Sequence, residues 1–155
     1  MEAYERQARQ ELRRWQHDMQ RNPSVISKLS RRVQVKVASW IPEKVHKAIT
    51  ETIRKMIHAV VFGSVHTTAK PLRDKSLEVR EAMVDERIRA YRNTAAIEGG
   101  VTGAGGILLG LADFPLLLGI KLKLLFDIAS LYGFDVDDYR ERVYVLYIFQ
   151  LAFSS

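Results

Sequence analysis

The stretch that decides the fold is AAIEGGVTGAGGILLGLADFPLLLGIKLKLLFDIASLYG, residues 95–133, in which glycines recur at helical spacing. Gly99, Gly103, Gly106 and Gly110 are separated by four, three and four residues, which places all four on one stripe of a helix. Each glycine inside a helix costs about 1 kcal/mol relative to alanine, so four on one face need a structural reason. Close approach of another helix is the usual reason, in protein as in lipid, and we expect these glycines to be helix-packing residues.

Asp113-Phe114-Pro115 interrupts this apolar stretch. Aspartate is typical of a helix N-cap and proline of the first helical turn, which predicts two helices, 95–111 and 115–132, joined as a hairpin. Gly133 is expected to end the second helix at the C′ position. Residues 101–120 approach the length of a membrane span, but the Asp-Phe-Pro interruption would then lie in hydrocarbon. A hairpin that is buried, or that inserts reversibly, therefore fits better than a spanning helix.

The remaining chain also predicts helices. Tyr4, Ala8, Leu12, Trp15 and Met19 form the apolar stripe of an amphipathic helix. A second helix is expected after Ser24 and a third after Pro42, so that basic helices occupy residues 1–62. A loop over 63–75, a helix over 76–97 capped by Ser76 and an apolar helix over 138–153, capped by Asp135 or Asp137, complete the chain. The prediction is a single all-α domain, residues 1–155, with six to seven helices around the central Gly-rich hairpin 95–133.

Composition and charge narrow the classes of function. The chain has 155 residues, 47% of them hydrophobic, and no cysteine, which indicates a globular protein without disulfides or thiolate metal sites. Residues 1–58 hold 13 Lys and Arg against 6 Asp and Glu, a net charge of +7, whereas residues 99–155 hold 4 against 6, a net charge of −2. This asymmetry favours contact with an anionic surface, either phospholipid or nucleic acid, although a merely solvated basic face explains it equally well. The charged N-terminus predicts no signal peptide.

Few residues are candidates for catalysis or for binding a cofactor or metal ion. The Gly-rich segment lacks the Lys-Ser/Thr and the preceding strand of a phosphate-binding loop, and the four histidines lack metal-ligand spacing. We therefore predict no catalytic residue, cofactor or metal ion. Asp113, Lys123 and Asp127 remain as candidate functional polar residues, because they are unusual in an apolar helix. Lys123 and Asp127 stand at i, i+4 and can pair, and a capping role accounts for Asp113.

Several segments resemble the EcsC family of bacteria. The resemblance covers all 155 residues, and its most specific parts are Glu98–Gly106, Ala112–Pro115, Ile128–Asp135 and Glu141–Phe153. It implies an ABC-transporter-associated protein of unknown biochemical activity, and it supplies no catalytic residues to carry over. Family members usually continue further, which predicts that the present chain is truncated at its C-terminus.

Three functions follow as hypotheses. The leading one is a non-enzymatic accessory protein, cytoplasmic and peripheral at the inner face of the cell membrane, that contacts an anionic membrane surface or ABC-transporter subunits. The second is a hydrolase acting on a lipid or peptide with Asp113 or Asp127 in its site, which would require a closed polar pocket around the carboxylate. The third is a helical nucleic-acid-binding protein, which is not favoured because no aromatic platform accompanies the basic residues.

Overall fold

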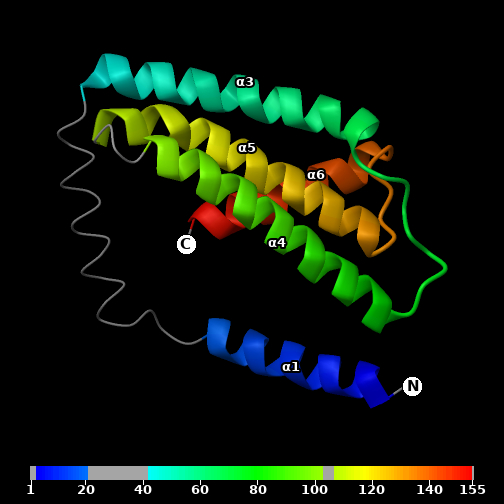
Figure 1. The fold of residues 1–155 in the computed structure, drawn as a ribbon. Coiled ribbons are helices and arrows are strands. Elements are labelled where there is room, and N and C mark those ends of the chain that lie inside the picture. The colour runs from blue at the N-terminus through cyan, green and yellow to red at the C-terminus, as the bar shows by residue number, and fades with distance from the viewer. Residues whose placement is uncertain (1–2, 21–41, 103–106, 155) are drawn as a thin grey trace. The chain divides into compact units, whose positions relative to one another are not determined.

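The computed structural model describes residues 3–20, 42–102 and 107–154, and for 97–102, 107–112 and 153–154 it describes the backbone alone (Figure 1). The chain divides into two compact units, Met1–Ala48 and Ile49–Ser155. The described part of the first unit consists of helix α1, Ala3–Met19, and the start of α3. The second unit contains the core.

The prediction of an all-α protein is confirmed for the described residues, which form five helices and no strand. The helix expected after Ser24 lies in residues 21–41, outside the described residues, so six to seven helices cannot be counted. The helices that follow α1 are α3, Glu43–Thr67; α4, Leu77–Thr102; α5, Ile107–Leu131; and α6, Tyr139–Ser154.

The prediction of a hairpin broken at Asp113-Phe114-Pro115 is wrong. Helix α5 runs from Ile107 to Leu131 and contains Pro115 in its interior. The expected helices 76–97 and 95–111 are replaced by α4, which continues to Thr102, and by α5, which begins at Ile107; residues 103–106 lie outside the described residues. An interior proline costs about 3 kcal/mol because it removes a backbone hydrogen bond. Pro115 is itself buried, so packing of α5 offsets this cost.

Other helix ends also differ from expectation. Helix α3 continues past Gly63 to Thr67 instead of ending at residue 62, and the Ser64 hydroxyl bonds back to the Val61 carbonyl oxygen at 2.8 Å. Asp138, rather than Asp135 or Asp137, caps α6, since its carboxylate accepts the Arg140 backbone N–H at 2.8 Å. The predicted Ser76 cap of α4 is confirmed by the Val79 N–H, which donates to the Ser76 hydroxyl at 3.4 Å.

The C-terminal end of α5 has the predicted glycine termination. Gly133 has a φ of +94°, which is the left-handed conformation of a helix-ending glycine. The Phe134 N–H donates to the Ala129 carbonyl oxygen at 3.0 Å, and this bond across five residues is characteristic of a Schellman motif. The loop before α4 is joined to this end of α5 by the Leu72 N–H, which donates to the Ser130 carbonyl oxygen at 2.9 Å. Arg80 of α4 donates to the Tyr132 and Arg73 carbonyl oxygens and so holds the two segments together.

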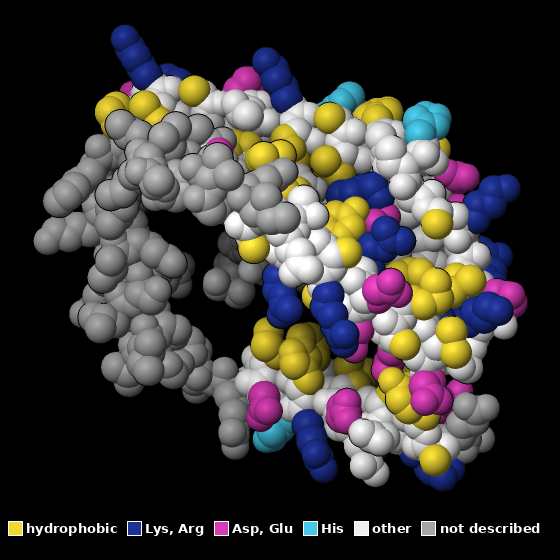
Figure 2. All heavy atoms as spheres, in the orientation of Figure 1, with side chains coloured by type: hydrophobic (Ala, Val, Ile, Leu, Met, Phe, Trp, Pro, Cys, Tyr) yellow, Lys and Arg dark blue, Asp and Glu magenta, His cyan; other side chains and the backbone are white. Residues whose placement is uncertain are grey.

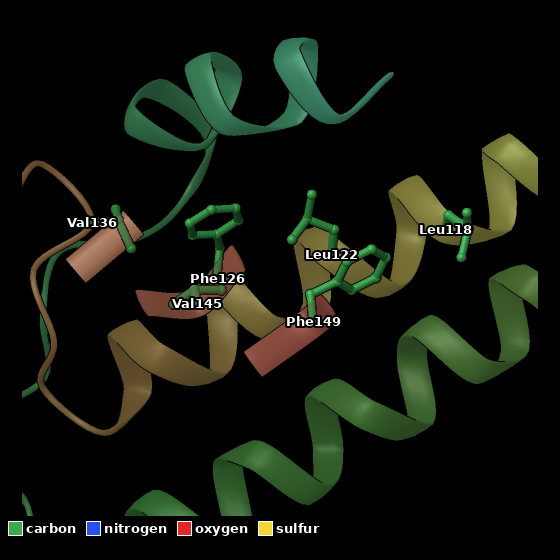
Figure 3. Packing of buried hydrophobic residues seen from close by; sticks show 6 residues of the cluster. All are labelled: Leu118, Leu122, Phe126, Val136, Val145 and Phe149. Carbon is green, nitrogen blue, oxygen red and sulfur yellow. The ribbon is translucent and has the colours of Figure 1, made fainter. Parts of the chain in front are cut away.

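Helix α5 supplies the centre of the core. Leu118, Leu122 and Phe126, spaced by four residues, are buried on one face of α5, and Figure 3 shows Leu122 and Phe126 pointing toward α3. Val145 and Phe149 of α6 pack into the same cluster (Figure 3). The partly buried residues of α3 that complete it are Ile53, Met56, Ile57, Val60 and Val61.

One glycine of α5 allows α3 to come close. A Cβ on Gly119 would lie 3.0 Å from the Met56 Cγ and 3.1 Å from its Sδ. The predicted packing glycines are not available for the same test: Gly103 and Gly106 lie outside the described residues, and for Gly99 and Gly110 only the helical backbone is described. Their role as packing residues stays a prediction.

Candidate functional site

The sequence-predicted pair Lys123 and Asp127 forms the centre of a polar cluster around the buried carboxylate of Asp127 in the second unit. The Asp127 side chain is 8% exposed, and its Oδ1 accepts a hydrogen bond from the Lys123 Nζ. Its Oδ2 accepts the Tyr91 hydroxyl proton at 2.7 Å and lies 3.9 Å from the Arg87 Nη1. We call these four residues the carboxylate cluster. Both oxygens of the buried carboxylate are therefore engaged, as a buried charge requires.

The carboxylate cluster joins three parts of the chain. Arg87 and Tyr91 lie on α4, one turn apart, and Lys123 and Asp127 lie on α5, also one turn apart. Lys123 also donates to the Thr68 hydroxyl, just after α3, at 3.2 Å. Burial and the hydrogen bond to Asp127 raise the pKa of Tyr91 well above its usual range, so its hydroxyl remains a donor across the physiological pH range. This arrangement can hold α4 against α5.

Asp113 lies apart from this cluster. Its predicted role as a helix cap is wrong, because it lies within α5, six residues after the start at Ile107. Its Oδ2 is buried, and no hydrogen-bond partner for that oxygen is found among the described residues. The structure thus brings together two of the three candidate polar residues and leaves the third elsewhere on α5.

No described group of His, Asp and Glu side chains has the geometry to hold a metal ion. Two hollows lie between helices in the described part of the second unit, and neither is lined by Asp113 or Asp127. The first, of about 190 Å³, lies between α5 and α6 among apolar residues that include Ile128, Val145 and Ile148. The second, of about 540 Å³, lies between α3 and α6.

Helix α1 carries the predicted amphipathic pattern. Leu12, Trp15 and Met19 lie on one face and are 51%, 59% and 64% exposed. None of the residues of α1 is buried. An exposed face of this kind, with a tryptophan at its centre and arginines on the opposite side, is typical of helices that lie in a membrane interface.

We find no helix among the described residues that combines the length and the apolarity needed to cross a bilayer. In α5, the polar side chains Asp113, Lys121, Lys123 and Asp127 interrupt the apolar sequence.

Residues 6–155 match the EcsC protein family, and the chain belongs to this family. Among curated proteins it is 47% identical over 147 residues to Protein EcsC of Bacillus subtilis (strain 168), a match that covers 94% of this chain and 62% of that protein. It is 34% identical over 106 residues to the uncharacterized protein YdbA of the same organism, covering 68% of this chain and 38% of YdbA. The chain thus spans less than two thirds of the length of either relative. No solved structure matches it.

Sequence reasoning missed most partners of Asp127. The i, i+4 spacing identified Lys123, but Tyr91 lies 36 residues from Asp127 and Arg87 lies 40. Thr68, which accepts a hydrogen bond from Lys123, lies 55 residues from that lysine, and no local pattern links these segments. A weak signal existed for Tyr91, which falls on the inward stripe of its helix. Gly119 was also missed, because it stands alone and belongs to no repeat.

Proposed function

We propose that this chain is a membrane-associated accessory protein that docks on the anionic surface of the cell membrane, at its cytoplasmic face, through the N-terminal unit. The single observation that carries the proposal is the exposed apolar face of α1, formed by Leu12, Trp15 and Met19. In water this face has an unfavourable free energy of hydration, and insertion between lipid headgroups removes it from water.

Charge supports the same surface. Arg6, Arg9 and Arg13 lie away from the apolar face of α1, although Glu5, Glu11 and Asp18 reduce the net charge of this helix. The next part of the sequence, residues 21–41, contributes five Lys and Arg and no Asp or Glu. Each cation near an anionic membrane contributes about 1 kcal/mol of attraction, which salt weakens.

ABC-transporter subunits are the protein partners that fit this location. The family resemblance implies an association with an ABC transporter, and such a transporter lies in the membrane on which α1 would dock. In this proposal, the N-terminal unit supplies the lipid contact and leaves the second unit available for the transporter.

The hydrolase alternative has less support. Asp127 already accepts hydrogen bonds from Lys123 and Tyr91, so a substrate would have to displace one of these partners before the carboxylate could act. Neither hollow described above places Asp113 or Asp127 in its lining. A closed polar pocket around either carboxylate, which this alternative requires, is not found among the described residues.

Vesicle flotation tests the proposal. Wild-type protein is mixed with phosphatidylcholine vesicles that contain or lack phosphatidylglycerol, at low and at high salt. We expect recovery with the anionic vesicles, a decrease at high salt and a further decrease for Trp15→Ser. Gln10→Ser, an exposed change on the polar face of α1, is the matched control and should float like wild type. Equal recovery on neutral and anionic vesicles would refute the electrostatic part.

Variants that remove charge test whether vesicle binding depends on the cations of the N-terminal unit or on the total charge of the protein. Arg31→Gln with Arg32→Gln removes two cations from the basic sequence that follows α1 in the chain, and Arg89→Gln with Arg92→Gln removes two exposed cations from α4. Loss of two interfacial cations corresponds to about 2 kcal/mol, or about 30-fold in the partition coefficient. The first pair should show this loss and the second should not. If both pairs lose binding equally, or if DNA competes as well as anionic vesicles do, the N-terminal unit is not a specific membrane contact.

A further inference from the structure

The hollow of about 540 Å³ between α3 and α6, which we call the α3–α6 groove, has an apolar floor. One wall is a single face of α3, since Arg54, Ile57, His58, Val61 and Phe62 recur at intervals of three, one, three and one. Ile57 and Val61 pack against the core cluster below. Phe62 is 63% exposed, and its ring lies 4.3 Å from that of His58 between centroids. The groove therefore exposes an ordered apolar surface along α3.

The opposite wall is one face of α6. Tyr139, Arg142, Val143 and Leu146 stand at intervals of three, one and three. Leu146 packs against the core, whereas Val143 is 43% exposed. The Arg142 guanidinium donates to the Val136 carbonyl oxygen at 2.8 Å and lies 5.9 Å from the centre of the Tyr139 ring. These contacts hold a cation beside the apolar floor.

The polar lining of the groove is cationic. Its described lining includes Arg54 and Arg142 with His58, and no acidic side chain. Glu51, one turn from Arg54 on α3, lies outside this lining, and its carboxylate lies 3.1 Å from the Arg54 Nη2. Figure 2 shows Lys, Arg and His side chains along the edge formed by α3, with hydrophobic and some acidic side chains between them. A ligand that matches this lining has an apolar body and a negative head.

The volume of the groove favours a chain-like ligand over a helix. One turn of an α-helix with its side chains, about 11 Å across and about 5.4 Å long, occupies about 500 Å³. The 540 Å³ of the groove therefore equals about one such turn, and a helix of about three turns would lie mostly outside it. That volume lies within the usual range of small-molecule sites, about 300–1,000 Å³.

We propose that the α3–α6 groove binds an anionic amphiphile, a single apolar chain that ends in a carboxylate or phosphate head. The chain lies over Ile57, Val61 and Leu146, and the head is held by Arg54 and Arg142. Charge-assisted bonds to arginine are the stronger class of hydrogen bond and suit either acidic head. The groove belongs to the second unit, so this site does not depend on membrane docking by α1.

Calorimetric titration of the full chain with monomeric probes tests the site. Dodecanoate and dodecyl phosphate carry the two acidic heads on one chain length, and dodecyl maltoside carries a neutral head on the same chain. We expect one bound molecule of an acidic probe and at least tenfold weaker binding of the maltoside. A preference between the carboxylate and the phosphate then indicates a fatty acid or a phospholipid-derived source. Equal affinity for the neutral probe would overturn the proposal.

Matched variants locate the ligand. Arg54→Gln and Val143→Asn should each weaken dodecanoate binding at least fivefold, and both positions are exposed, so the fold should be kept, as circular dichroism can verify. Ile148→Asn changes a comparably exposed residue of α6 that lines the smaller hollow, and Trp15→Ser changes α1; both should bind normally. Loss of binding in either control, with normal binding by Val143→Asn, would overturn the assignment. If no probe binds and Val143→Asn abolishes self-association in sedimentation, the groove is occupied by a second copy and the proposal fails.

Discussion

Tyr91 connects the carboxylate cluster to a pH dependence of stability. Burial, and then its hydrogen bond to Asp127, raise the pKa of the Tyr91 hydroxyl above the ordinary value of 10.0. Above about pH 10 the unfolded chain loses the Tyr91 proton while the folded protein keeps it, so the unfolded state binds fewer protons and the free energy of unfolding falls as pH rises. Burial raises the pKa of Tyr132 as well, so part of this alkaline loss belongs to that residue.

Tyr91→Phe should therefore have opposite effects in two pH ranges. Near neutral pH it should lower the free energy of unfolding by about 1–2 kcal/mol, because the hydrogen bond to a charged acceptor is lost. Between about pH 10 and pH 12 its stability should decline less steeply than that of wild type. Urea denaturation at a series of pH values measures both effects, with the exposed Tyr147→Phe as control. Parallel pH profiles for Tyr91→Phe and wild type would contradict this account.

Two glycines with different surroundings give a paired test. Gly133 has a positive φ of +94°, and an added Cβ would lie 3.2 Å from the Leu72 carbonyl oxygen. Gly133→Ala should therefore lower stability by about 1–3 kcal/mol. Gly63 lies inside α3 with nothing within 4 Å of its Cβ position, so Gly63→Ala should raise stability by about 1 kcal/mol. Thermal unfolding measures both changes in stability. A stabilising effect of Gly133→Ala would contradict the role of Gly133 in ending α5.

At the scale of elements, the contact of α3 with α5 depends on Gly119. A leucine at this position would overlap Met56, whose side chain already lies 3.0 Å from the Cβ position. Overpacking of this kind typically costs about 1–3 kcal/mol, so Gly119→Leu should lower the thermal midpoint. Met56→Ala provides space at the same contact, and the double variant should lose less stability than the sum of the two single variants. Additive losses would show that the two helices are not in close contact there.

Helix α5 also shows why local signals misplaced a helix end. Asp113 and Pro115 have the composition of a helix start, yet both lie inside α5. The residues C-terminal to Pro115, with Leu118, Leu122 and Phe126 at four-residue intervals, bury a continuous apolar stripe against α3 and α6. Each buried side chain of that stripe contributes to the stability of α5, whereas the proline lowers it at one position only. The summed burial therefore outweighs the cost of the proline.

At the scale of the whole molecule, the division into two units predicts separable stability and membrane binding. None of the residues of α1 is buried, and the core cluster lies within residues 49–155. A chain that begins at Pro42, and so keeps α3 complete, should unfold cooperatively with a thermal midpoint within a few degrees of the full chain. It should no longer float with anionic vesicles. Loss of cooperative unfolding in this chain would indicate that the N-terminal residues are required by the core.

The sequence by itself determined the helical class, the family, the amphipathic face of α1, the Ser76 cap, the Gly133 termination and the Lys123–Asp127 pair. The cap, the termination, the amphipathic face and the ion pair depend on residues within one helix or one turn, where spacing alone specifies which groups meet. Only the tertiary structure decided that α5 continues through Pro115, that Tyr91 and Arg87 reach Asp127, and that Gly119 meets Met56. These contacts join segments far apart in the chain, and the burial of apolar surface that brings them together has no local sequence period.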